Sequence, residues 1–181
     1  AYIDKGESLH PDVRGTILTT MARTGGEQEY NELLGIYQNS TSSDEKLSIT
    51  GAMTSFDQPD LHTKVLDLIK TDTIRNQDIS YWIAYSFMNR HSRQQTWQWL
   101  QNNWDWLNEV IGTDLSFSRT PVYAARSFAD EKMLAEYKSF FEPRLEPMLQ
   151  RSYDQGVEII QTNAAWRKRD AQSAINWFTA Q

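Results

Sequence analysis

The stretch HPDVRGTILTTMARTGGEQEYNELLGIYQN, residues 10–39, has the pattern of two helices joined by a tight turn. Pro11 suits the first turn of a helix, and the pair Gly25–Gly26 would end that helix and let a second one begin. Apolar residues recur at helical spacing in both halves: Val13, Ile17, Leu18 and Met21, then Tyr30, Leu33, Leu34 and Tyr37. The stretch therefore predicts a helical hairpin.

The same pattern returns further along the chain. Helix starts are expected near residues 11, 26, 43, 58, 77 and 92. Alternate starts are about 32 to 34 residues apart, which is the spacing of stacked helical hairpins. No linker-like segment interrupts the series. We expect an all-α fold, an α-solenoid of antiparallel helical hairpins like the HEAT or armadillo superhelix, forming a single domain over residues 1–181.

Four tryptophans crowd into QTWQWLQNNWDWL, residues 95–107, which we expect to form one helix ending near Gly112. Large apolar groups on two helix faces favour burial between neighbouring helices over a stacking platform for nucleic acid. Trp97 and Trp104 are expected in the core, and Trp99 or Trp106 is expected to reach solvent.

The end of the chain is less regular. Pro121 indicates a broken or short helix, and Asp130 is a candidate N-cap for the segment EKMLAEYKSFFE. We expect one long helix over residues 148–163. A separate short helix would follow and carry Ile175, Trp177 and Phe178.

The composition excludes several kinds of function. A net charge of −6 argues against a nucleic-acid binder, and no apolar run is long enough to predict a membrane helix. There is no cysteine, which suits a cytoplasmic protein. His10, His62 and His91 are followed by PDVR, TKVL and SRQQ, so none opens an HExxH zinc motif. We expect surface or capping histidines, no metal or other cofactor in this chain, and no catalytic constellation.

One stretch resembles a known family. TIRNQDISYWIAYSFMNRHSRQQTWQWLQNNWDWL, residues 73–107, is similar to the C-terminal helical domain of aminopeptidase N-type zinc metallopeptidases. The matching positions are Arg75, Gln77, Asp78, Asn89, Arg93, Trp97, Trp99, Leu100, Asn103 and Trp104. Ser92 stands where the family often has glycine. The resemblance extends from about residue 9 to residue 180, with Glu158, Asn163, Trp166 and Trp177 at matching places, and the segment over residues 14–30 looks like enzymes of lactic-acid bacteria.

The resemblance implies what spacing alone does not. The chain would be the later portion of the C-terminal domain of a zinc aminopeptidase, and its opening residues 1–10 would lie in the middle of the parent protein. The zinc and the catalytic residues would lie in an upstream domain of the same polypeptide, which would be this chain's partner. The domain would cover the active site and accommodate peptide substrates without catalysing the reaction itself.

Arginine is the residue best suited to hold a peptide's terminal carboxylate, because its guanidinium binds both oxygens. Arg75 is the first candidate because it falls in the matching motif; Arg90, Arg93 and Arg119 follow. A surface salt bridge or a helix-end contact is the alternative for each of them. The alternative for the whole chain is a free-standing helical-repeat adaptor that binds a protein partner.

Overall fold

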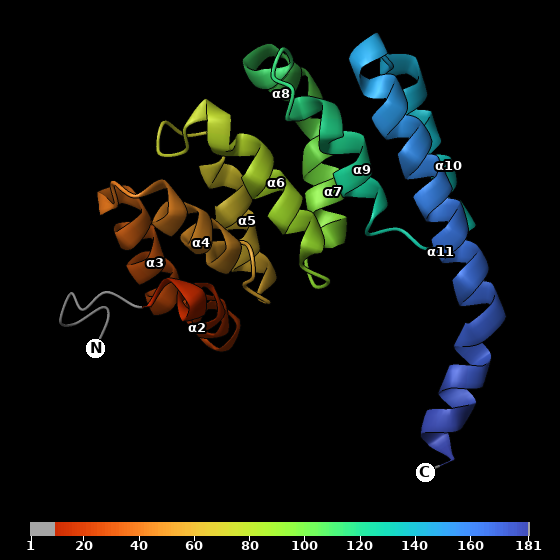
Figure 1. The fold of residues 1–181 in the computed structure, drawn as a ribbon, viewed down its shortest axis with the longest axis horizontal. Helices are drawn as coiled ribbons and strands as arrows, with labels where there is room; N and C mark the ends of the chain where they lie inside the picture. Colours follow the sequence, from red (N-terminus) through yellow and green to blue (C-terminus); the bar gives the residue numbers. More distant parts are fainter. Residues whose placement is uncertain (1–9, 181) are drawn as a thin grey trace. The chain divides into compact units, whose positions relative to one another are not determined.

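The computed structural model describes residues 10–180, and within that range it contains helices and turns but no β-strand. Ten α-helices, α2 to α11, follow one another with three short 3-10 helices between them (Figure 1). The predicted all-α class is confirmed. The helices gather into two compact units, the first ending at Asn103 and the second beginning at Trp104. A single domain and a superhelix stay predictions.

Over residues 10–103 the first unit contains six α-helices and one 3-10 helix. They are α2 (Pro11–Thr24), α3 (Glu27–Asn39), α4 (Ser43–Met53), α5 (Pro59–Leu68), η1 (Asn76–Asp78), α6 (Ile79–Met88) and α7 (Arg93–Asn102). Every predicted start lies within two residues of an observed one. The prolines, glycines and capping residues of the sequence therefore predict where these helices begin.

First-turn prolines and one side-chain cap explain three of these starts. Pro11 and Pro59 each occupy the first helical position, where a missing N–H costs nothing. At α4 the Ser42 hydroxyl accepts a hydrogen bond from the Glu45 N–H at 3.3 Å. The Glu45 carboxylate accepts from the Ser40 hydroxyl at 2.6 Å, and the Ser42 N–H donates to the Ser40 hydroxyl oxygen at 3.2 Å, so Ser40 links the two ends of the cap.

Successive helix pairs pack in a regular order. Helix α2 packs on α4, α4 packs on α6, and α5 packs on α7, as the succession from red to green in Figure 1 shows. Three hydrogen bonds join residues 33 positions apart: Gln58 to the Gly25 carbonyl, Asn89 to the Phe56 carbonyl, and Lys70 to the Asn103 side-chain oxygen. The period read from the sequence thus appears in space as contacts between one pair and the next.

The apolar stripe predicted for α2 is only partly buried. Leu18 is in the core, but Val13 is 46% exposed and Ile17 is 44% exposed. In α6, whose residues are apolar nearly all round, Trp82 is fully buried and meets the Tyr37 ring edge-on at 5.4 Å between ring centroids. This contact joins α3 and α6 in the core of the unit.

The predicted tryptophan helix is wrong in one respect: it is two helices. Helix α7 ends at Asn102, and α8 (Trp104–Ile111) begins after Asn103. Asn103 caps the C-terminus of α7: its N–H donates to the Trp99 carbonyl at 3.0 Å and to the Leu100 carbonyl at 3.3 Å, and its side chain also donates to the Trp99 carbonyl at 2.8 Å. The burial predictions are confirmed, since Trp97 and Trp104 are buried and Trp99 and Trp106 are partly exposed.

The second unit is built around aromatic rings. After α8 it contains η2 (Phe117–Arg119), α9 (Thr120–Ala125), α10 (Glu131–Phe141), η3 (Glu142–Arg144) and α11 (Pro147–Thr179). The Trp104 ring lies 5.0 to 5.5 Å, centroid to centroid, from the rings of Phe117, Phe140 and Phe141. The Asp130 carboxylate caps α10 as predicted, accepting from the Met133 N–H at 2.8 Å.

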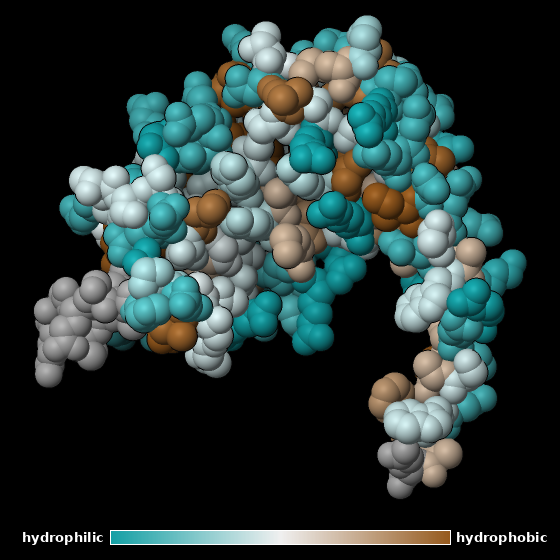
Figure 2. All heavy atoms as spheres, viewed as in Figure 1, coloured by the Kyte–Doolittle hydropathy of each residue, from teal (hydrophilic) through white to brown (hydrophobic). Residues whose placement is uncertain are grey.

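Helix α11 corrects a second prediction, because it is one continuous helix of 33 residues rather than a long one and a short one. The segment between Asn163 and Ile175 contains neither glycine nor proline, so nothing ends the helix there. Towards its C-terminus the helix exposes four large apolar side chains: Trp166, Ile175, Trp177 and Phe178. Figure 2 shows brown and tan residues among white and teal ones along the end of this helix. No helix within residues 10–180 is both long and apolar enough to cross a bilayer.

Candidate functional site

Three of the four arginines predicted to bind peptide line hollows of the surface. Arg75 lines a hollow of about 160 Å³ beside α4 and α6. Arg90 lines one of about 290 Å³ at the turn between α6 and α7. Arg119 lines one of about 570 Å³ in the second unit. Arg93 is the first residue of α7 and is partly exposed.

The Arg75 guanidinium already has an anionic partner. Its Nε donates to the Asp78 carboxylate at 2.7 Å, and this hydrogen bond together with the charge of Asp78 raises the pKa of Arg75. Lys46, which lines the same hollow, lies over the Tyr37 ring at 4.6 Å from its centroid. A peptide carboxylate reaching Arg75 would have to share the cation with Asp78.

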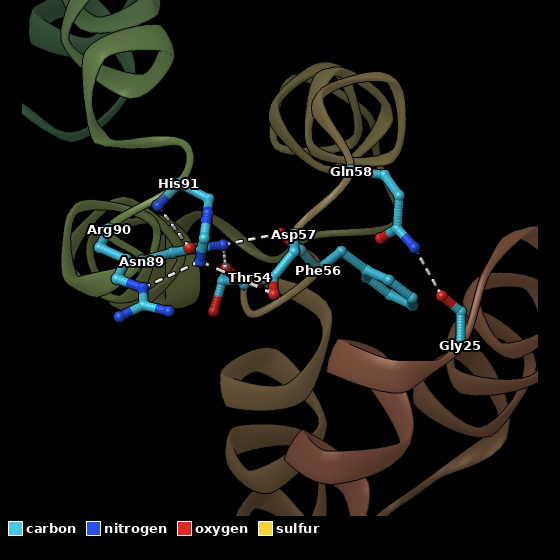
Figure 3. A network of polar contacts seen from close by, with 8 residues as sticks. All are labelled: Gly25, Thr54, Phe56, Asp57, Gln58, Asn89, Arg90 and His91. Carbon is cyan, nitrogen blue, oxygen red and sulfur yellow. Dashed lines mark hydrogen bonds and ion pairs between the residues drawn. The ribbon is translucent and has the colours of Figure 1, made fainter.

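The Arg90 hollow is built on Asn89, a buried side chain that holds two turns together (Figure 3). The Asn89 amide donates to the Thr54 carbonyl at 3.1 Å and to the Phe56 carbonyl at 2.7 Å. Its oxygen accepts from the His91 N–H at 3.0 Å. These three bonds fix the turn after α6 against the turn after α4, and so they fix where Arg90 and His91 stand.

Charges of both signs meet in this hollow. The Arg90 Nε donates to the His91 Nε2 at 2.9 Å. The Asp57 carboxylate lies 3.7 Å from the same nitrogen. Arg23, from the last turn of α2, completes the lining. Two guanidinium groups thus face one carboxylate, which leaves a net positive charge for an anionic ligand.

The structure does not gather the candidates of the first unit into one site. Arg75 precedes α6 and Arg90 follows it, so a helix of 10 residues, about 15 Å long, separates them. Arg90 and Arg93 belong to the same turn. One carboxylate could therefore contact Arg75 or the turn after α6, but not both.

Three residues that line these hollows were not predicted as site residues from the sequence. They are Arg23 and His91, which line the hollow of Arg90, and Arg126, which lines the hollow of Arg119. Arg126 could have been found, because it lies seven residues after Arg119 and therefore on the same helical face. Arg23 could not, since its place beside Arg90 depends on how α2 packs.

The prediction of surface or capping histidines is wrong for His62, which is fully buried. The His62 Nε2 lies 3.1 Å from the Thr96 hydroxyl, and that hydroxyl donates its own hydrogen to the Ser92 carbonyl. The Nε2 must therefore carry the proton, which leaves Nδ1 buried without a partner. Burial lowers the pKa of His62 to about 4. Among residues 10–180 no three His, Asp or Glu side chains come together as a metal site.

Comparison with known proteins shows to which family the chain is related. Over residues 1–162 the sequence matches the family described as ERAP1-like C-terminal domain. The chain belongs to this family. It is 30% identical over 178 residues to Aminopeptidase 2 of Candida albicans, which covers 96% of this chain and 19% of that protein. It is 29% identical to Aminopeptidase N of Lactobacillus helveticus over 88% of this chain and 19% of that protein.

A plant relative, Aminopeptidase M1 of Arabidopsis thaliana, is 28% identical over 87% of this chain and 18% of its own length. The ERAP1-like domain thus spans about a fifth of the length of the aminopeptidases it matches. All three relatives are named aminopeptidases, so the predicted resemblance to aminopeptidases is confirmed. Because they come from a yeast, a lactobacillus and a plant, the origin of this chain in a lactic-acid bacterium stays a prediction.

Proposed function

We propose that this chain is the non-catalytic C-terminal domain of a zinc-dependent aminopeptidase of the aminopeptidase N type, where it covers the active site and accommodates the peptide substrate. One observation carries the proposal: nearly the whole chain aligns with about a fifth of several aminopeptidases. Zinc and the catalytic residues would belong to an upstream domain of the same polypeptide. We place the parent enzyme in the cytoplasm.

In this proposal the helical pairs stack as an α-solenoid whose concave face meets the peptide. The hydrogen bonds that recur at a separation of 33 residues support such stacking, because each ties one pair to the next. A surface of this kind can receive peptides of different length and sequence, since helix ends and turns along it present polar groups to the backbone.

Arg90 is the candidate that we favour for the peptide's terminal carboxylate. Among residues 10–180 its guanidinium makes one hydrogen bond, from Nε to the His91 imidazole, which leaves its outer nitrogens for a bidentate bond to a carboxylate. Arg75 is shared with Asp78, and Arg93 lines none of the three hollows. Arg119 belongs to a separate hollow in the second unit.

The test compares Arg90→Gln with Arg75→Gln in the parent aminopeptidase. We expect Arg90→Gln to raise KM about tenfold for a peptide with a free terminal carboxylate, because one charge-assisted pair is lost. The same peptide as a C-terminal amide should show no change. Lys168→Gln, at an exposed site on α11, is the control variant. Equal losses on the acid and the amide would show that Arg90 does not bind the carboxylate.

The isolated chain offers a second test. We expect no stoichiometric zinc by elemental analysis and no release of chromophore from aminoacyl p-nitroanilides. Bound zinc at one equivalent, or turnover that follows the chain through purification, would overturn the assignment of catalysis to an upstream domain.

An adaptor that binds a protein partner is the second candidate, and one observation favours it. Helix α11 exposes Trp166, Trp177 and Phe178 near its C-terminal end, and exposed aromatic groups of this kind are common in protein interfaces. The coding sequence upstream of residue 1 separates the two functions. An HExxH motif in the same reading frame supports the aminopeptidase domain, and a frame without one supports the adaptor.

A further inference from the structure

The largest of the three hollows lies in the second unit, where two helical faces meet. The segment of η2 and α9 contributes Arg119, Val122, Tyr123 and Arg126, which follow the spacing i, i+3, i+4, i+7 of one face. Helix α11 contributes Gln155, Glu158 and Ile159, spaced i, i+3, i+4. The hollow is therefore a groove between two helices and not an irregularity of a loop.

Contacts at the side of the groove hold the two helices at a fixed separation. Gly156, between the lining residues of α11, lets the backbones approach so closely that a Cβ there would lie 3.1 Å from the Ala125 Cβ. The Val122 N–H donates to the Ser152 hydroxyl at 3.4 Å. The groove thus exists before any ligand binds, which lowers the entropy cost of binding.

The polar side chains of the groove are unused. Within residues 10–180, Arg119, Tyr123, Arg126, Gln155 and Glu158 make no side-chain hydrogen bond or ion pair. Some polar side chains elsewhere in the same unit are paired: the Tyr153 hydroxyl donates to Glu142 at 2.8 Å, and Arg167 lies 3.8 Å from Asp130. A groove that concentrates five unpaired donors and acceptors is suited to a polar ligand.

The signs of the charges in the groove restrict the kinds of ligand that it can bind. Two guanidinium groups would attract a carboxylate, but a simple carboxylic acid would leave Glu158 without a partner. A simple amine would meet Glu158 and be repelled by Arg119 and Arg126. Val122 and Ile159 add an apolar surface to the lining. A molecule that satisfies all of these groups carries a carboxylate, an ammonium and an aliphatic side chain.

We propose that this groove binds a free α-amino acid with an aliphatic side chain. The carboxylate binds Arg119 and Arg126, the ammonium binds Glu158, and the side chain covers Val122 and Ile159. A hollow of about 570 Å³ has room for one such molecule with its water. Only the source of the ligand rests on the proposed function: an aminopeptidase releases free amino acids, so the ligand would be the product of the parent enzyme.

The experiment follows amide signals of the full 181-residue chain by NMR while L-leucine is added. We expect saturable shifts confined to residues around Arg119–Arg126 and Gln155–Ile159. N-acetyl-leucine lacks the ammonium and leucine amide lacks the carboxylate, so each should bind at least about tenfold more weakly than leucine. Equal binding of N-acetyl-leucine and leucine would overturn the role of Glu158, and no saturable shift with leucine would overturn the site.

Variants locate the two charges. Glu158→Gln should weaken leucine binding about tenfold and leave N-acetyl-leucine unchanged, whereas Arg126→Gln should weaken both ligands. Lys168→Gln, ten residues further along α11, removes a positive charge outside the groove and should change neither. An unaltered thermal midpoint shows that each variant is folded. Because the titration uses no peptide hydrolysis, its failure would leave the proposed aminopeptidase function standing.

Discussion

In the first unit the turns between helices are tied by buried polar side chains, whereas in the second unit the helices meet through aromatic rings and one glycine. Asn89 forms three hydrogen bonds with backbone groups of two turns. Trp104 instead packs against three phenylalanine rings, and Tyr137 stacks on Tyr153 at 5.6 Å. A hydrogen bond is lost when its donor is replaced, whereas ring packing is disturbed when the volume of a side chain changes. The stability of the first unit should therefore be most sensitive to loss of polar groups, and that of the second unit to changes of volume.

The largest effect is expected where the second unit is packed most tightly. A Cβ at Gly156 would overlap the Tyr137 hydroxyl oxygen and lie 2.7 Å from the ring carbon that carries it. Tyr137 is buried and cannot move aside without disturbing its stack on Tyr153. Gly156→Ala should therefore lower the free energy of unfolding by about 3 kcal/mol, measured by urea denaturation followed by tryptophan fluorescence.

Gly35 provides the matched control, because it also lies inside a helix but has no neighbouring atom within 4 Å of the point where a Cβ would stand. Gly35→Ala should raise stability by up to about 1 kcal/mol, since alanine is the better helix former. If both substitutions shifted stability in the same direction, tight packing at Gly156 would not be what distinguishes the second unit.

The next effect concerns the polar tie of the first unit. Asn89→Ala removes both donors, and it leaves the carbonyls of Thr54 and Phe56 without these partners. A loss of about 2 to 3 kcal/mol is expected in the same denaturation assay. Asn39→Ala, at an exposed position on α3, should cost less than about 0.5 kcal/mol. A loss at Asn89 no larger than at Asn39 would mean that the turns are held together by their apolar contacts instead.

The sequence was informative about the fold where the signals are local. Prolines, glycines and capping residues act within one helical turn, so the starts of α2 to α7 were predicted to within two residues. The break at Asn103 was not, because asparagine is tolerated inside helices, and only the structure shows that Asn103 caps the end of α7 here. The predicted separate final helix had no glycine or proline before it to end the long one.

The site was less predictable than the fold for a related reason. Arginines are easily found in a sequence, but whether one is free depends on its neighbours in space. Arg75 was the first candidate on motif grounds, and its bond to Asp78 engages it. Arg126 and Glu158, which complete the groove around Arg119, come from two segments 32 positions apart. Only packing brings them together.

A third prediction uses the buried histidine of the first unit and pH. The pKa of His62 is about 4 in the folded chain, against 6.5 when exposed, because burial disfavours the charged form. The unfolded chain therefore binds the proton first as the pH falls, and stability is lost from about pH 6.5 downward. Between pH 7 and pH 5 this loss should reach about 2 kcal/mol.

His62→Gln should remove this part of the pH dependence, while His91→Gln, at an exposed site, should keep it. The measurement is the free energy of unfolding at several pH values for each variant and for the unchanged chain. Parallel curves for the unchanged chain and His62→Gln would rule out His62 as the titrating group.

The smallest effects should come from two side-chain caps, Asp130 in the second unit and Ser42 in the first. Asp130 accepts from the Met133 N–H at 2.8 Å, and Ser42 accepts from the Glu45 N–H at 3.3 Å. The shorter bond involves a charged acceptor at a helix N-terminus, so Asp130→Ala should cost about 1 kcal/mol and Ser42→Ala about 0.5 kcal/mol. The rate of hydrogen exchange at the Met133 and Glu45 amides measures whether each cap is formed. Asp130→Asn keeps a capping oxygen, so the Met133 amide should exchange nearly as slowly in this variant as in the unchanged chain. If the Met133 amide exchanges as fast in Asp130→Asn as in Asp130→Ala, the ion pair between Asp130 and Arg167, and not the cap, stabilises the start of α10.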